Sequence, residues 1–104
     1  MNTTICIGGR KKVLPSEIVL FIADVNYSVA YFENGKKIIV ATNLGKLEER
    51  FAETNHFFRP NRSTLINLHY AEYSEKNAEL VVQNTHFIGV SRRKKSLLMK
   101  YLKQ

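Results

Sequence analysis

The sequence predicts a mainly β fold, in which short strands form small sheets and helix is confined to one mid-chain segment and the end of the chain. Two observations lead to this prediction. Short apolar, β-branched and aromatic segments alternate with turn residues through most of the chain. Apolar side chains recur at helical spacing only in residues 42–51 and after Ser91.

The first half of the chain is predicted to form hairpins. We expect strands over Thr4–Ile7, Lys12–Leu14, Ile18–Ala23, Tyr27–Phe32 and Lys36–Ala41. Gly8-Gly9 predicts a tight turn, and Pro15-Ser16-Glu17 predicts a turn or a single helical turn. Asn34-Gly35 predicts a type I′ hairpin turn, in which both central residues need a positive φ.

The second half combines the two helices with a further hairpin. Residues 42–51 predict a short amphipathic helix that Thr42 or Asn43 can cap. Residues 56–59 are expected to end the loop that follows, and 75–77 and 83–85 to form turns. We expect strands over Thr64–Asn67, Ala71–Ser74, Ala78–Val82 and His86–Val90, and then a C-terminal helix marked by Leu97, Leu98, Tyr101 and Leu102.

The charge of the chain is basic and unevenly distributed. Lys and Arg number 16 against 9 acids, which gives a net charge of +7 and a pI near 9.7. No acid follows Glu79, and the remaining residues carry Arg92, Arg93, Lys94, Lys95, Lys100 and Lys103. Such a balance favours a polyanionic partner. A merely soluble surface is the alternative that total charge leaves open.

Several other classes of protein have little support. Cys6 is the one cysteine, so no disulfide can form within the chain. This fits a protein of the reducing cytoplasm. The apolar runs are too short to span a bilayer, and no secretory signal precedes them. His56, His69 and His86 lack local metal-ligand spacing, and no nucleophile, base and orienting group form a motif. We therefore expect a cytoplasmic protein that is not an enzyme and has no cofactor.

The segment from Ser91 to Lys95 gives the sharpest indication of a binding site. A helix N-terminus already carries partial positive charge, so the consecutive cations of this segment are destabilising there. A bound anion would offset that repulsion. Ser91 can cap the helix and also donate to a phosphate.

Two polar connections complete the candidate surface. In Arg59-Pro60-Asn61-Arg62-Ser63, arginine offers a fork matched to guanine and asparagine one matched to adenine, and Pro60 stiffens the expected loop. Asp24-Val25-Asn26-Tyr27-Ser28 connects two predicted strands, and alone it could be an ordinary hairpin.

In this order, these segments resemble the LytTR DNA-binding domain, an output module of bacterial response regulators. The resemblance runs through Ile18–Ala23, Asn26-Tyr27-Ser28, Asn34-Gly35-Lys36 and Asn43–Glu49, and then through Phe58–Asn67 and Ile88–Arg93. It covers roughly Thr4 to Leu102. Pro60 departs from it where the family usually has another apolar residue, and Gly89 departs where proline is common.

The resemblance implies an elongated arrangement of short β-sheets, and function in transcription regulation within a bacterial two-component system. Its members insert loops into successive major grooves, commonly at direct repeats, so double-stranded DNA and a second copy on an adjacent repeat are the expected partners. Carried over by motif, the DNA-binding residues are Asn26, Tyr27, Asn61, Arg62, Ser91, Arg92, Arg93 and Lys94. Arg59 is expected instead to pin its loop.

We expect residues 1–104 to form a single domain without a receiver domain, either a stand-alone regulator or an excised part of one. Two other functions remain as alternatives. An RNA-binding or general basic module could stack bases on Tyr27, Tyr31, Phe57 and Phe58. A small enzyme would need an acid–base or metal site that the sequence does not display.

Overall fold

The computed structural model describes residues 3–102, and its centre is an antiparallel sheet of five strands. The strands are β3 (Ile18–Asp24), β4 (Tyr27–Phe32), β5 (Lys37–Val40), β6 (Phe57–Asn61) and β7 (Thr64–Asn67). Their order in the sheet is β5-β4-β3-β7-β6, so β3 lies in the middle with β4 and β7 as neighbours.

Two smaller sheets flank the central one. A hairpin pairs β1 (Ile5–Gly8) with β2 (Lys11–Val13), and a three-stranded meander contains β8 (Ala71–Ser74), β9 (Glu79–Val82) and β10 (His86–Gly89). The helices are α1 (Leu44–Phe51) and α2 (Arg92–Leu102), with single 3₁₀ turns at Pro15–Glu17, Ala52–Thr54 and Leu68–Tyr70.

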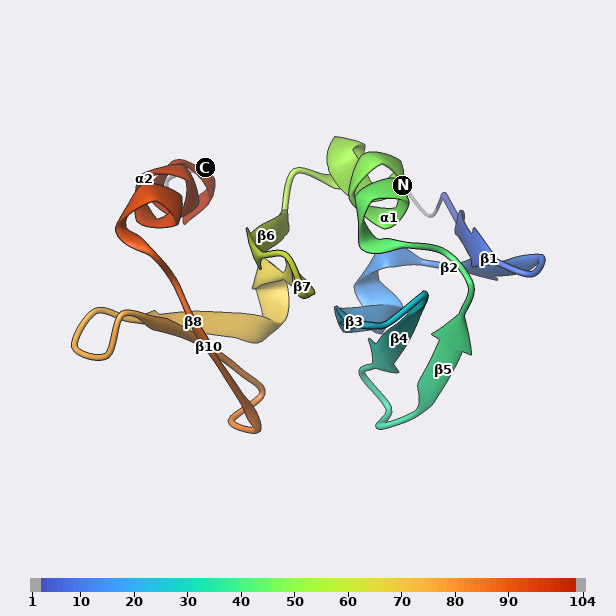
Figure 1. Ribbon diagram of the computed structural model, residues 1–104, viewed down its shortest axis with the longest axis horizontal. Helices are drawn as coiled ribbons and strands as arrows, with labels where there is room; N and C mark the ends of the chain where they lie inside the picture. Colours follow the sequence, from blue (N-terminus) through green and yellow to red (C-terminus); the bar gives the residue numbers. More distant parts are fainter. Residues whose placement is uncertain (1–2, 103–104) are drawn as a thin grey trace.

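These elements form two lobes on either side of β6 and β7 (Figure 1). One lobe contains α1 with β1–β5, and the other contains α2 with β8–β10. The molecule measures 40 × 31 × 24 Å. The mainly β fold with a mid-chain and a C-terminal helix is therefore confirmed.

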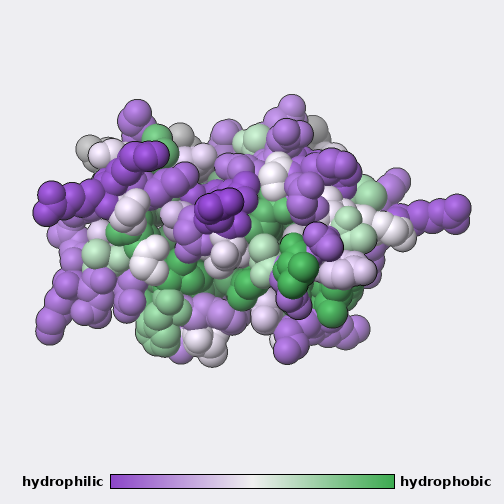
Figure 2. Space-filling model, viewed as in Figure 1, coloured by the Kyte–Doolittle hydropathy of each residue, from purple (hydrophilic) through white to green (hydrophobic). Residues whose placement is uncertain are grey.

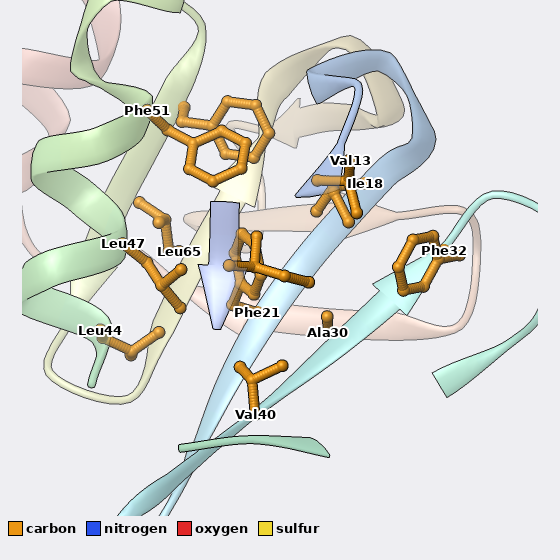
Figure 3. Packing of buried hydrophobic residues seen from close by; sticks show 12 residues of the cluster. Val13, Ile18, Phe21, Ala30, Phe32, Val40, Leu44, Leu47, Phe51 and Leu65 are labelled. Carbon is orange, nitrogen blue, oxygen red and sulfur yellow. The ribbon is translucent and has the colours of Figure 1, made fainter. Parts of the chain in front are cut away.

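The first core lies between the central sheet and α1. The ring of Phe21 packs edge-on against that of Phe51, with 5.4 Å between the ring centroids (Figure 3). The centroid of the Phe57 ring lies 4.6 Å from that of Phe51. Leu44, Leu47 and Phe51 are the buried residues of α1, which is the spacing of one helix face. Asn43 caps α1 by accepting a hydrogen bond from the Lys46 amide at 2.9 Å.

The second core lies on the opposite face of the sheet. Its buried members are Val19, Leu20, Phe58, Ile66, Leu80, Val82, Val90 and Leu98. Leu98 is the fully buried residue of α2 and attaches that helix to the sheets. Strand β3 contributes side chains to both cores, which explains why Ile18–Ala23 is a continuous apolar run and not an alternating one.

One strand of the central sheet was missed by the sequence interpretation. Residues 57–61 form β6, although a loop was expected there, and Pro60 is buried within that strand and does not stiffen a loop. Proline is tolerated because β6 is an edge strand and its pairing with β7 shifts between Phe58 and Asn61.

The type I′ turn expected at Asn34-Gly35 was also wrong. Gly35 has φ 90°, but Asn34 is not among the residues with positive φ. The Gly35 amide donates to the Phe32 carbonyl at 3.0 Å, and the Phe32 amide donates to the Lys36 carbonyl at 2.9 Å. This is the three-residue hairpin loop in which a turn is followed by a left-handed glycine.

Candidate nucleic-acid interface

The first two predicted contact segments meet at one end of the central sheet. Strands β3 and β4 are joined by the two-residue turn Val25-Asn26, here named the first turn. Strands β6 and β7 are joined by Arg62-Ser63, here named the second turn. The Ala23 amide donates to the Ser63 carbonyl at 2.8 Å, so a hydrogen bond joins the bases of the two turns.

Asn61 shapes the second turn with its side chain. Its Oδ1 accepts hydrogen bonds from the Ser63 amide at 2.7 Å and from Thr64 Oγ1 at 3.0 Å. An adenine-matched fork needs both the oxygen and the NH₂ of the amide. Because the oxygen is engaged, only the NH₂ donors of Asn61 are available, while the Arg62 side chain is exposed beside it.

Arg59 holds the second turn against α1. Its Nη1 lies 3.1 Å from Glu48 Oε1, and its Nη2 donates to the Arg62 carbonyl at 3.1 Å. The expectation that Arg59 pins the loop is thus confirmed. The fork geometry of a guanidinium group allows one side chain to bridge two acceptors in this way.

The start of α2 brings cations to the same region. Ser91 caps the helix, since its Oγ accepts a hydrogen bond from the Lys94 amide at 3.2 Å. Lys94 lines a shallow hollow of about 330 Å³ together with Glu48, Arg59, Asn61 and Arg62. Arg92 and Arg93 precede Lys94 in the chain and are exposed. Hydrophilic side chains project over α2 in the space-filling view (Figure 2).

Lys95 is directed away from the other cations of this helix. Its Nζ lies 3.3 Å from Glu75 Oε1 and 5.9 Å from the centre of the Tyr73 ring. The helical spacing explains the difference: Lys94 and Lys95 precede the buried Leu98 by four and three residues, and at 3.6 residues per turn they lie on opposite sides of it. The free cations at the start of α2 are therefore Arg92, Arg93 and Lys94, among residues 3–102.

Asn26 and Tyr27 stand at the exposed edge of the first turn. Asn26 is exposed and Tyr27 is 52% exposed. The Ala23–Ser63 hydrogen bond places the first turn and the second turn at the same end of the sheet, and Lys94 lines the hollow with Asn61 and Arg62. The other aromatics considered for base stacking are engaged: Phe57 and Phe58 belong to the cores, and Tyr31 packs against His86 at 5.2 Å.

Two histidines form a pair that local spacing could not reveal. The rings of His56 and His69 stack at 4.1 Å with an interplanar angle of 11°. Burial, and then the neighbouring His69, lower the pKa of His56 below 6.5, although a backbone hydrogen bond at Thr54 opposes the shift. Within residues 3–102 no group of three or more His, Cys, Asp or Glu side chains is placed to hold a metal ion.

Comparisons with known proteins assign the chain to a family. A family model of DNA-binding domains matches residues 8–103, which defines the class of the protein. The family is the LytTr DNA-binding domain, and the chain belongs to it. No curated protein matches the chain. Among solved structures, the chain is similar to the LytTr DNA-binding domain of a methyl-accepting/DNA response regulator from Bacillus cereus. That likeness has a TM-score of 0.67 and 18% identity, and covers 96% of this chain and 94% of that one.

Membership of this family gives the domain its partner and its role. The protein binds DNA and acts in transcription regulation, and its family is one of DNA-binding domains and not of enzymes. No helix within residues 3–102 is both long and apolar enough to cross a membrane.

Proposed function

We propose that the domain recognises a specific duplex sequence by inserting its two turns and the start of α2 into the major groove. The observation that supports this most directly is the Ala23–Ser63 hydrogen bond, together with the hollow shared by Arg62 and Lys94. These contacts gather three polar segments, which come from distant parts of the chain, into one neighbourhood.

The side chains divide into two kinds of contact. Arg62 and Arg93 have forks matched to the O6 and N7 acceptors of guanine, and Asn26 offers an amide matched to adenine. Asn61 acts through its NH₂ alone, because its oxygen holds the turn. Tyr27 contacts the DNA beside Asn26. Arg92, Lys94 and the Ser91 hydroxyl bind phosphates at the start of the helix.

The electrostatic part of this proposal predicts a salt dependence. Two of the free cations on this surface, Arg92 and Lys94, would neutralise two phosphates. At about −0.9 per phosphate the log–log slope is then about −1.8, so affinity falls roughly 12-fold between 50 and 200 mM salt. A slope near zero would contradict the assignment.

Selection of bound duplexes from a random pool tests the proposal. We expect one enriched motif, repeated in the same direction at a spacing of about one helical turn, where two copies of the domain sit on adjacent repeats. Arg62→Ala and Arg93→Ala should each weaken the selected site by about 1–3 kcal/mol and relax preference at one base pair.

Lys36→Ala is the matched control for these two variants. Lys36 is an exposed cation at the β4–β5 turn, the opposite end of the same sheet from the first turn. The Lys36→Ala variant should leave base preference unchanged. Enrichment of no motif, or equal effects of all three variants, would argue for general basic binding, including binding to RNA. We further propose that the domain acts in the bacterial cytoplasm as the output module of a two-component system.

A further inference from the structure

The first turn differs chemically from the rest of the surface. The first turn and the two residues that flank it, Asp24 and Tyr27, contain no cation and one carboxylate. Cations lie instead on the second turn and α2, at Arg62 and Arg92–Lys94. Charge therefore cannot attract the first turn to phosphates, and what it offers to DNA is an amide, a phenol and an apolar side chain.

The apolar side chain is Val25, and its position is unusual in two respects. It is 92% exposed, which is the largest exposure among the large hydrophobic residues described. It also has φ 55°, a left-handed conformation that is rare for β-branched residues. Of the two central residues of the turn only Val25 has positive φ, which is the pattern of a type II′ turn, where glycine is normal.

The surrounding structure maintains this strained conformation. Asp24 and Tyr27 form the last pair of the β3–β4 ladder, so two residues must reverse the chain. The Ala23–Ser63 hydrogen bond fixes the end of β3 against the second turn. A glycine would relieve the strain, so the presence of a valine with no packing partner calls for an explanation outside the folded domain.

We propose that Val25 is a specificity-determining residue that contacts the C5-methyl group of a thymine in the major groove. The methyl group is the apolar feature of the base edges there, and small apolar side chains are its usual partners. The inference rests on the proposed function, since it requires the two turns to enter that groove. It adds an apolar contact to the amide and guanidinium contacts proposed above.

The test removes the two halves of this contact separately. Each thymine of the selected duplex is replaced in turn by deoxyuridine, which lacks only the methyl group. We expect the wild-type domain to lose roughly fourfold in affinity at one thymine, the value of one buried methyl-sized group. Val25→Gly should bind the thymine duplex roughly fourfold more weakly and show no further loss with uracil at that position, whereas Val25→Ala keeps a small apolar side chain and should retain part of the sensitivity to uracil.

A stability measurement separates this role from a structural one. Val25→Gly should keep or raise the thermal midpoint, because glycine accepts the positive φ, whereas Val25→Ala should leave it near the wild-type value. Phe87→Ala removes another exposed apolar side chain, on β10, and should retain full sensitivity to uracil.

The outcomes distinguish this inference from the proposed function. If a motif is selected but contains no invariant thymine, or if Val25→Gly remains as sensitive to uracil as the wild type, the role of Val25 is overturned while duplex recognition stands. If no motif is selected, duplex recognition fails and the thymine contact fails with it.

Discussion

Replacing Arg59 by lysine tests whether the bridge between α1 and the second turn prepares the domain for its target. Lysine keeps the positive charge but is a single ammonium on a flexible stem, so it cannot reproduce both 3.1 Å contacts of the guanidinium with Glu48 and the Arg62 carbonyl. The variant should retain one of these interactions and lose the other.

The magnitude follows from the two contacts. The exposed ion pair is worth a few tenths to about 1 kcal/mol. The hydrogen bond from a charged donor is worth about 1.5 kcal/mol or more when buried, and less here because the Arg59 side chain is 25% exposed. We therefore expect Arg59→Lys to lower the free energy of unfolding by about 1 kcal/mol. The second turn would then be less ordered before binding, and the free energy needed to order it on DNA should weaken specific binding about fivefold.

The assay compares a selected duplex with an unrelated one at several salt concentrations. Specific affinity should fall, while non-specific affinity and the salt slope stay unchanged because the charge is preserved. Arg50→Lys is the matched control, since Arg50 Nη1 donates to the Cys6 carbonyl at 3.0 Å, a similar bond remote from the second turn. If Arg50→Lys and Arg59→Lys reduce discrimination equally, or neither does, the positioning role of Arg59 is wrong.

Three further predictions concern stability. Leu98→Ala should lower the free energy of unfolding by about 2–5 kcal/mol in urea titrations, because Leu98 is the fully buried anchor of α2; a loss below 1 kcal/mol would mean that α2 is held by other contacts. Asn67→Ala should cost about 1–3 kcal/mol, since the buried Asn67 Nδ2 donates to the Ile18 carbonyl at 2.8 Å and removal leaves that acceptor unpaired; Asn77→Ala, an exposed change, should cost far less. Because the pKa of folded His56 lies below 6.5, the unfolded chain binds the proton more readily, so stability present above pH 6.5 should decline as the pH falls below it. His56→Gln should flatten that decline, and an unchanged pH profile would contradict the assignment.

Local patterns predicted most of the secondary structure because most strands are short hairpins with turn residues between them. The bounds of β4, β7 and β8 agree with those expected from the sequence. Strand β6 escaped prediction because Pro60 cannot donate to a ladder, and nothing local shows that residues 57–61 occupy an edge. A strand of this kind is defined by its partner β7 and by the core that Phe57 and Phe58 enter.

The candidate site was predictable as a set of segments but not as a geometry. Residue types and spacing made Arg62 and the cations Arg92, Arg93 and Lys94 candidates, since these chemistries suit DNA. The sequence could not show that the Asn61 oxygen is engaged in its own turn, or that Lys95 pairs with Glu75. Val25 was hidden for a similar reason, because its positive φ comes from the two-residue connection and not from its own preference.

The hydrogen bond between Ala23 and Ser63 has a consequence for how target preference can change among members of the family. Two segments that share a fixed base present their side chains as one unit, so tilting either of them displaces the other. Exchanging a single segment between two relatives should therefore yield a hybrid that binds neither parental operator well. New preferences would arise by paired substitutions, and residues 24–27 and 61–64 should show strong epistasis in combinatorial libraries.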